Sequence, residues 1–199
     1  MKIGRICLTA TIIATVLLFA GYASRIITED EVGLFDYPSE FFCGSSGNHI
    51  DYQTPGKCAA YATAYLLRHF GEDVNGEELY PELKRSFGFV SANSIINVLK
   101  QHGYQAKACH GSIDTLKQQL AKGNPIIVFI RIPKDTHYAV VVGYDEQHIY
   151  LVDSLAENAN VQTNAQNAQY NRVLTTEAFE DVWNTRTLLP KNIYIVSGT

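Results

Sequence analysis

The stretch "DYQTPGKCAAYATAYLL" (Asp51–Leu67) joins a Pro-Gly turn directly to a helical pattern. Apolar residues recur along it at steps of three and four, which predicts a helix over residues 58–70 with Gly71 placed to end it. Cys58 therefore stands at the first position of a predicted helix. Such a cysteine can fill space, form a disulfide or act as a nucleophile, and the rest of the sequence bears on this choice.

Downstream, the sequence changes from helical patterns to short runs rich in β-branched and aromatic residues. Further helices are expected at residues 76–88, where Pro81 interrupts the pattern, and at 91–103, 112–123 and 175–183. Strands are expected at residues 125–132, 137–145, 148–154 and 192–198. Residues 156–171 are rich in Asn, Gln and Ala and are expected to form a loop. Helices followed by antiparallel strands indicate an α+β fold.

Residues 1–23 have the pattern of an export signal. Lys2 and Arg5 precede an apolar run, and a small-residue site ends at Ala23. The charge-free residues 6–24 also fall within the roughly 17–25 residues that span a bilayer, so a retained membrane tether is an alternative to cleavage. In both cases the rest of the chain is expected to be exported, either secreted or anchored to the outer face of the cytoplasmic membrane.

The 199 residues are enough for one domain, expected over residues 51–199 after an irregular lead-in or tether over residues 24–50. The composition, 46% hydrophobic and 18% charged, is ordinary for a globular protein. The net charge is −4 and no basic cluster is present. Nucleic acid is therefore excluded as the main partner, because binding its backbone requires concentrated Lys and Arg.

Three cysteines follow the export signal: Cys43, Cys58 and Cys109. An odd number in an exported domain leaves one thiol unpaired or paired between chains. We expect a disulfide between Cys43 and Cys109, which leaves Cys58 as the free thiol.

Cys58 and His137 are candidates for a nucleophile and its base. A thiol at a helix N-terminus lies near a partial positive charge that favours the thiolate, although free cysteines are more often buried fillers. Among the six histidines, His137 opens an apolar strand, where its side chain can face a helix N-terminus. The alternative for His137 is a strand-end histidine that bonds a neighbouring carbonyl group.

Asp153 and Gln53 are the other two candidates. Asp153 follows an apolar run, where a carboxylate is costly to bury unless it is paired, and it could accept the imidazole N–H of His137. Otherwise it is a turn aspartate. The side-chain amide of Gln53 could donate to an oxyanion together with the backbone N–H of Cys58. Otherwise it is an ordinary loop glutamine.

The motifs "QTPGKCAAYATAYLL", "HYAVVVGYD", "IYLVDS" and "LTTEAFEDVW" resemble those of the papain-like C39-type bacterial cysteine peptidases, over about residues 50–197. The resemblance implies a papain-like fold, with the nucleophile at a helix start in an N-terminal helical half and an antiparallel sheet after it. It implies Cys58 as nucleophile, His137 as general base and acid, Asp153 as orienting residue and Gln53 as oxyanion donor. It implies a peptide or protein substrate, and no metal or other cofactor.

The sequence departs from the papain pattern at several points. Gln53 lies five positions before Cys58, one fewer than is usual, and Ala59 replaces the glycine that often follows the nucleophile. The third member is Asp rather than Asn, and the signature C-G-S-C-W is absent. The sequence also contains no transporter segments, so the leader-cleaving role of family members fused to exporters does not carry over.

Three functions are compatible with the sequence. The first is an exported cysteine peptidase. The second is acyl transfer or amide hydrolysis on a cell-wall peptide or an isopeptide bond, which uses the same residues. The third is a catalytically inactive binding module of the same fold, in which the residue set is incidental.

Overall fold

The computed structural model describes residues 27–30, 33, 36–44, 47–86, 88–161, 169–185 and 190–198. The predicted export signal (1–23) and membrane tether (6–24) lie outside the described residues. Within the described ranges, no helix is both long enough and apolar enough to cross a bilayer.

The helices are α2 (Cys58–His69), α3 (Gly76–Leu79), α4 (Ala92–Gln101), α5 (Ile113–Leu120) and α6 (Thr176–Trp183), with the short 3-10 helices η1 (Tyr80–Glu82) and η2 (Ala156–Asn158). Four of them agree with the predicted ranges to within a few residues. The prediction for residues 76–88 was wrong in its second half, because the helical turns end at Glu82 and Arg85–Ser86 form a strand. As predicted, Ser91 and Ser112 cap α4 and α5, and each side chain accepts a backbone N–H from the first turn of its helix. Pro81 separates α3 from the chain that follows it, as expected.

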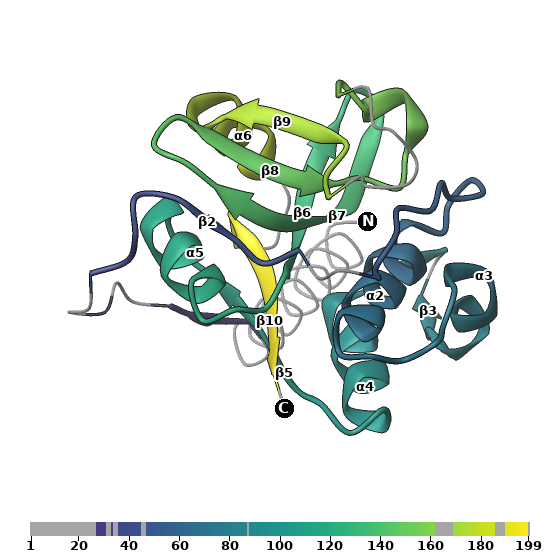
Figure 1. Cartoon of the computed structure of the whole chain (residues 1–199). Coiled ribbons are helices and arrows are strands. Elements are labelled where there is room, and N and C mark those ends of the chain that lie inside the picture. The colour runs from purple at the N-terminus through teal and green to yellow at the C-terminus, as the bar shows by residue number, and fades with distance from the viewer. Residues whose placement is uncertain are drawn as a thin grey trace, which may run out of the picture.

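Helix α2 is the central helix of the domain. Every residue from Ala59 to Leu67 is buried, and four of these nine are alanines. Small side chains let the helix pack closely against β6 and β7, and Leu66 and Leu67 are fully buried. Figure 1 shows α2, α3 and α4 together at one side of the sheet and α5 and α6 at the other.

One large sheet carries the remaining core. Its strands are β1 (Ile27–Glu29), β2 (Phe41–Phe42), β5 (Gln105–His110), β6 (Ile126–Ile132), β7 (Asp135–Tyr144), β8 (His148–Val152), β9 (Arg172–Thr175) and β10 (Ile193–Gly198). The order is β1-β5-β10-β6-β7-β8-β9, and β2 pairs with β7. All pairings are antiparallel except that of β1 with β5. The α+β class and the predicted hairpin of β7 and β8 are therefore confirmed.

Several strands were not predicted from the sequence. Residues 105–110, "QAKACH", contain no Val, Ile, Thr, Phe, Tyr or Trp, yet they form β5 between β1 and β10. Residues 172–175, "RVLT", form the short strand β9, which pairs with β8 at the end of the sheet. Two short segments of the expected lead-in, residues 24–50, also join the sheet as β1 and β2. A separate small hairpin pairs β3 (Arg85–Ser86) with β4 (Phe89–Val90).

The predicted disulfide between Cys43 and Cys109 is not formed, and the three cysteines of the described residues are free. Cys43 is attached to β7 through a 2.8 Å hydrogen bond from its N–H to the carbonyl oxygen of Val142. Cys109 lies in β5, and β10 and β6 separate β5 from β7. The three strand spacings of about 4.8 Å between β5 and β7 exceed the roughly 7 Å between Cα atoms that a disulfide can bridge.

An aromatic cluster fastens α6 to the sheet. The ring of Trp183 lies 5.3 Å from that of Phe179 and 5.8 Å from that of Tyr194, measured between centroids. The indole N–H of Trp183 donates to the carbonyl oxygen of Ile193 at 2.9 Å, so the polar group of this fully buried side chain has a hydrogen-bond partner.

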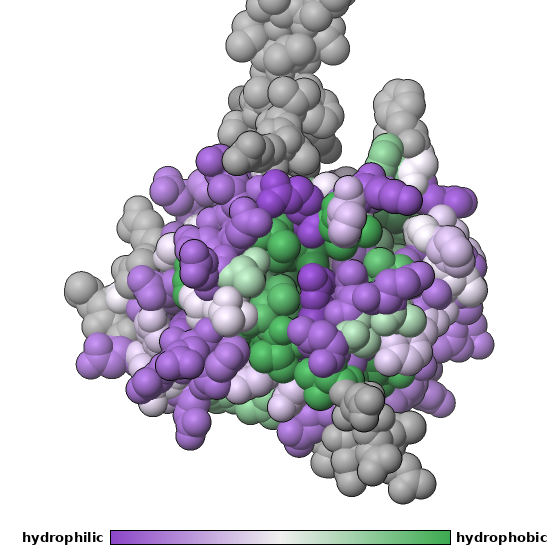
Figure 2. Space-filling model, turned by 90° about the horizontal axis from the view of Figure 1, so that it is seen from above, coloured by the Kyte–Doolittle hydropathy of each residue, from purple (hydrophilic) through white to green (hydrophobic). Residues whose placement is uncertain are grey.

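On the face of the molecule seen in Figure 2, hydrophobic residues gather in a band between hydrophilic ones.

Candidate active site

Cys58 is the first residue of α2 and is half-buried. The turn before it is formed by Pro55 and Gly56, and Gly56 has φ = +80°, a left-handed conformation that favours glycine. The cap residue Lys57 makes no side-chain capping bond, and the first turn of α2 contains no acidic residue. The positive end of the helix dipole is therefore available to a thiolate.

A carboxylate on α3 holds this turn in place. Glu77 Oε1 accepts hydrogen bonds from Thr54 Oγ1 at 2.7 Å and from the hydroxyl of Tyr61 at 2.8 Å, and Glu77 Oε2 pairs with the ammonium group of Lys57. These three partners lie before, at and after the start of α2. Hydrogen bonds from Lys57, Thr54 and Tyr61 lower the pKa of Glu77 to about 2, so its carboxylate stays charged near neutral pH.

His137 is the third residue of β7, opposite Ile130 of β6, and only 2% of it is exposed. Its Nε2 lies 2.7 Å from Asp153 Oδ1. Since the carboxylate can only accept, Nε2 carries the proton of this bond and Nδ1 is left for Cys58. Cys58, like Asp153, raises the pKa of His137, so the structure brings these three predicted residues together.

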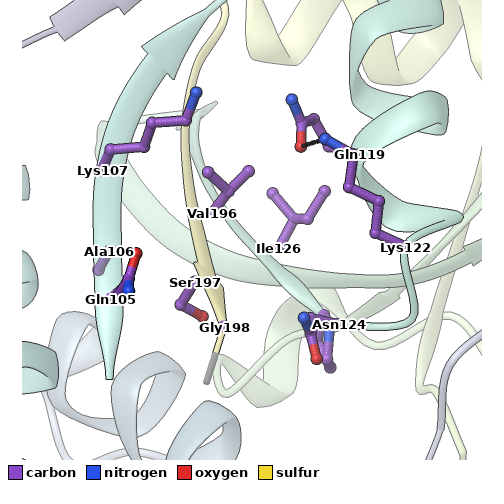
Figure 3. A pocket seen from close by; sticks show the side chains of 11 residues that line it. Gln105, Ala106, Lys107, Gln119, Lys122, Asn124, Ile126, Val196, Ser197 and Gly198 are labelled. Atoms are coloured by element: carbon purple, nitrogen blue, oxygen red, sulfur yellow. Dashed lines mark hydrogen bonds between the residues drawn. The ribbon is translucent and has the colours of Figure 1, made fainter. Parts of the chain in front are cut away.

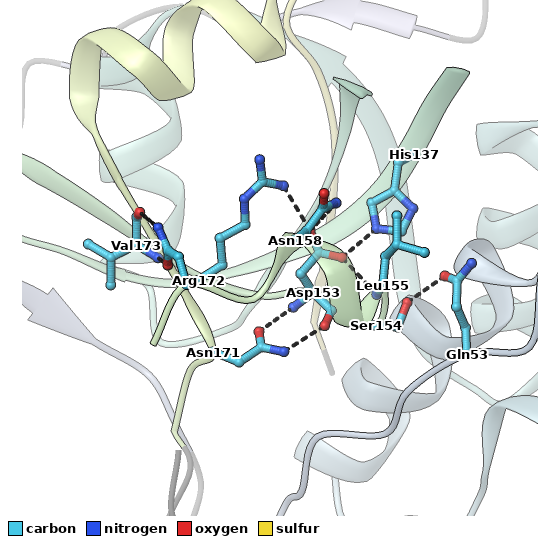
Figure 4. Close-up of polar contacts among 10 residues, drawn as sticks. Gln53, His137, Asp153, Ser154, Leu155, Asn158, Asn171, Arg172 and Val173 are labelled. Atoms are coloured by element: carbon cyan, nitrogen blue, oxygen red, sulfur yellow. Dashed lines mark hydrogen bonds and ion pairs between the residues drawn. The ribbon is translucent and has the colours of Figure 1, made fainter. Parts of the chain in front are cut away.

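Asp153 directly follows β8 and is fully buried. Besides His137, its carboxylate accepts the backbone N–H of Leu155 at 2.9 Å, the amide of Asn158 at 2.9 Å and the guanidinium of Arg172 at 2.8 Å (Figure 4). These partners offset the cost of burying a charge, which is large for an unpaired carboxylate.

Asn171 fixes the main chain of Asp153. Its Oδ1 accepts the N–H of Asp153 at 2.8 Å, and its Nδ2 donates to the carbonyl oxygen of Asp153 at 2.7 Å (Figure 4). Asn171 is itself fully buried. A side-chain amide here occupies the place where a strand partner would bond, so the aspartate is held rigidly after β8 has ended.

Gln53, the fourth predicted residue, lies beside this group. Its N–H donates to the carbonyl oxygen of Ser154 at 2.8 Å, and its side-chain Oε1 accepts the Ser154 hydroxyl at 2.7 Å (Figure 4). Because Oε1 is engaged by a donor, the Nε2 hydrogens of Gln53 remain available to a bound group. The shorter spacing to Cys58 therefore does not separate Gln53 from the other three residues.

The charges of His137 and Asp153 depend on each other. Burial lowers the pKa of His137, but hydrogen bonds to Asp153 and Cys58 outweigh it and raise that pKa to about 9. Burial raises the pKa of Asp153, but the hydrogen bond to His137, together with the charges of His137 and Arg172, leaves it lowered. The site therefore favours an imidazolium on His137 paired with a carboxylate on Asp153 at neutral pH.

Four residues of the site were not predicted from the sequence: Ser154, Asn158, Asn171 and Arg172. Ser154 is adjacent to a predicted residue, which is the only signal it gives. Asn171 ends the Asn-rich stretch expected to be a loop, and Arg172 begins the unpredicted strand β9. The roles of Asn171 and Arg172 depend on the pairing of β8 with β9, which the local sequence patterns do not predict.

A separate cavity of about 300 Å³ lies between β5, β10 and α5 (Figure 3). Lys107 and Lys122 line it, together with apolar residues such as Ile126 and Val196. The ammonium group of Lys122 donates to Gln119 Oε1 at 2.7 Å. None of the four predicted site residues lines this cavity, so it is distinct from the group around Cys58.

The model of the Peptidase_C39 like family matches residues 48–188, a span that includes all four predicted site residues. The chain belongs to this family. The resemblance noted in the sequence is thus confirmed, and family and fold together identify a C39-type cysteine peptidase. No curated protein matches this peptidase in sequence.

Solved structures similar to this C39-type peptidase have the same fold. A C39-like peptidase from Bacillus anthracis has a TM-score of 0.60 at 16% identity and covers 81% of this chain and 98% of its own. The peptidase domain of Streptococcus ComA, a bi-functional ABC transporter, has a TM-score of 0.58 at 16% identity and covers 76% and 98%. Xylellain, a cysteine protease from Xylella fastidiosa, has a TM-score of 0.53 at 14% identity and covers 85% and 91%.

Proposed function

We propose that this C39-type peptidase hydrolyses peptide bonds through a triad of Cys58, His137 and Asp153, with Gln53 as an oxyanion donor. The observation that carries the proposal is the 2.7 Å hydrogen bond from His137 Nε2 to Asp153 Oδ1, beside Cys58 at the first position of α2, which raises the pKa of the same imidazole. A nucleophile, a base and an orienting group in this sequence of contacts are what thiol catalysis requires.

The proposed reaction begins with Cys58 as a thiolate and His137 as an imidazolium. The Cys58 thiolate attacks the carbonyl carbon of the substrate, and the oxyanion is stabilised by the Gln53 amide and the backbone N–H of Cys58. The His137 imidazolium donates its Nδ1 proton to the leaving amine, which departs and leaves a thioester on Cys58. Neutral His137 then takes a proton from water, whose oxygen attacks the thioester to release the acid.

Asp153 orients the imidazole throughout this cycle. Because it is fully buried and bonded on both oxygens, it can turn neither away from His137 nor toward solvent. This supports an orienting role like that of the aspartate in a serine-protease triad, which stabilises the imidazolium without taking its proton.

The experiment is turnover of a peptide library by the full chain in detergent, with Cys58→Ala as control. Cleavage by the wild type alone supports the proposal. Casein and purified peptidoglycan, tested in parallel, separate a general peptidase from a cell-wall amidase or acyl transferase. A thiol-reactive peptide warhead that fails to label Cys58 under reducing conditions would instead favour an inactive binding module.

The proposal places this activity outside the cytoplasm. The support is the sequence of residues 1–23, in which two basic residues precede a long apolar run. Cell fractionation, with N-terminal sequencing of the product, tests this. A chain that begins after Ala23 in the extracellular fraction indicates secretion, an intact chain in the membrane fraction indicates a tether, and cytoplasmic recovery contradicts export.

A further inference from the structure

The carboxylate of Asp153 is shared between two cations, one on each oxygen. Oδ1 accepts the imidazole Nε2 of His137 at 2.7 Å, and Oδ2 accepts the guanidinium Nη1 of Arg172 at 2.8 Å. Arg172 comes from β9 and His137 from β7, with β8 between them. The carboxylate is fully buried and the arginine side chain is only 11% exposed, so solvent screens this pair weakly.

The sheet fixes the position of Arg172. It pairs with Leu151 of β8, two residues before Asp153, and the neighbouring Asn171 bonds the main chain of Asp153 on both sides. The guanidinium therefore does not depend on a flexible loop for its place. An arginine keeps its charge at all pH values at which the protein is folded.

We propose that Arg172 is a positioning residue that acts through Asp153: it holds the carboxylate and limits how strongly that carboxylate retains the proton of His137. The inference rests on the proposed triad. Without Arg172, no guanidinium would partly neutralise the carboxylate of Asp153. The carboxylate would then stabilise the imidazolium of His137 more strongly, and the imidazole would release its proton to a substrate less readily. Arg172 thus lowers the pH at which the imidazolium of His137 loses its proton.

No other group that contacts the pair of Asp153 and His137 in the described residues supplies a permanent positive charge. Asp153 otherwise meets the neutral side chain of Asn158 and the backbone of Leu155. The titratable groups that raise the pKa of His137 are Asp153 and Cys58, and neither is a cation. Of the residues bonded to Asp153, Arg172 is the one with a charge that does not titrate in the working range.

The test is the titration of His137 by ¹⁵N–¹H NMR in full-length protein that carries Cys58→Ala, so that no activity is needed. Arg172→Gln, which keeps a hydrogen-bond donor and removes the charge, is expected to raise the pKa of His137 by about one unit. Arg172→Lys keeps the charge and is expected to shift that pKa by no more than a few tenths. A matched control is Arg131→Gln, which breaks a surface pair with Asp181 and should leave His137 unchanged.

A His137 pKa that stays within about 0.2 unit in Arg172→Gln overturns the proposal, as does an equal rise in Arg172→Lys. If Arg172→Gln does not fold, Arg172→His gives the same comparison, since its imidazole is charged when the protein is folded at low pH and neutral near pH 9. Failure of the wild type to cleave any peptide would contradict the proposed function and leave this titration result standing.

Discussion

Gln53 and Ser154 are joined twice, once from the backbone N–H of Gln53 to the Ser154 carbonyl at 2.8 Å and once from the Ser154 hydroxyl to Gln53 Oε1 at 2.7 Å. This double contact ties the loop before the nucleophile to the residue that follows Asp153. The two halves of the proposed site are therefore linked directly, although the residues lie about a hundred positions apart in the chain.

Ser154→Ala should lower kcat by roughly tenfold with little change in KM, because the Gln53 amide loses the bond that aims its hydrogens. In a Gln53→Ala background, Ser154→Ala should lower kcat much less, since no amide remains to be oriented. Steady-state kinetics of the two single variants and the double variant measure this coupling.

Ser91→Ala is the matched control, because it removes a serine that caps α4 far along the chain from Gln53. It should lower the free energy of unfolding by about 1 kcal/mol and leave kcat unchanged. If the double variant shows a loss of kcat equal to the product of the two single fold-losses, Ser154 does not act through Gln53.

Asp153→Asn should reduce kcat by about 10²–10⁴-fold, because an amide of the same shape can hold His137 in the wrong tautomer and carries no charge. Cys58→Ala should abolish turnover. The exposed Asp181→Asn, which loses a carboxylate on α6, serves as the control and should keep full activity. Near-wild-type turnover in Asp153→Asn would remove Asp153 from the triad.

The pKa of His137, raised to about 9, predicts a loss of stability at alkaline pH. Below the unfolded pKa of about 6.5 the imidazole is protonated in both states, and its contacts with Asp153 and Cys58 contribute fully. Above that value the unfolded chain has released a proton that the folded protein still binds. Up to about 3 kcal/mol of the free energy of unfolding should therefore be lost as the pH rises to about 9.

Urea unfolding at pH 6 and pH 9.5, for the wild type and for His137→Gln, measures this contribution. The decline should be smaller in His137→Gln, since that residue cannot titrate. Peptide cleavage should also fall as the pH passes about 9, because the imidazolium is needed to protonate the leaving amine. Equal declines in both proteins would mean that His137 is not the titrating group.

The three free cysteines in the described part of the chain should react very differently with a thiol reagent. Burial raises the pKa of Cys43 to about 12 and also raises the pKa of Cys109, and both residues are almost inaccessible. Iodoacetamide should therefore label Cys58 first in the native protein, and labelling of Cys43 and Cys109 should follow only after unfolding. Mass spectrometry of digested peptides, with Cys58→Ala as control, reads out each position. Recovery of a peptide pair joined through Cys43 and Cys109 without reductant would contradict the free thiols.

The sequence predicted the parts of the fold in which local pattern and final structure agree. The helix from Cys58, the serine caps of α4 and α5 and the β7–β8 hairpin all follow from strong local signals. The strand at 172–175 and the roles of Asn171 and Arg172 depend on pairing with β8, which local patterns do not contain. The disulfide prediction was wrong because counting cysteines says nothing about which strands lie between them.

Strand β1 has a consequence for any shortened form of this peptidase. It covers the outer side of β5 from Ala108 to His110, and β5 pairs on its other side with β10. A chain that begins at residue 51 would retain all four proposed catalytic residues and leave the outer side of β5 from Ala108 to His110 without a strand partner. Such an edge invites pairing with a second molecule, so the shortened enzyme should aggregate more readily than the full-length protein.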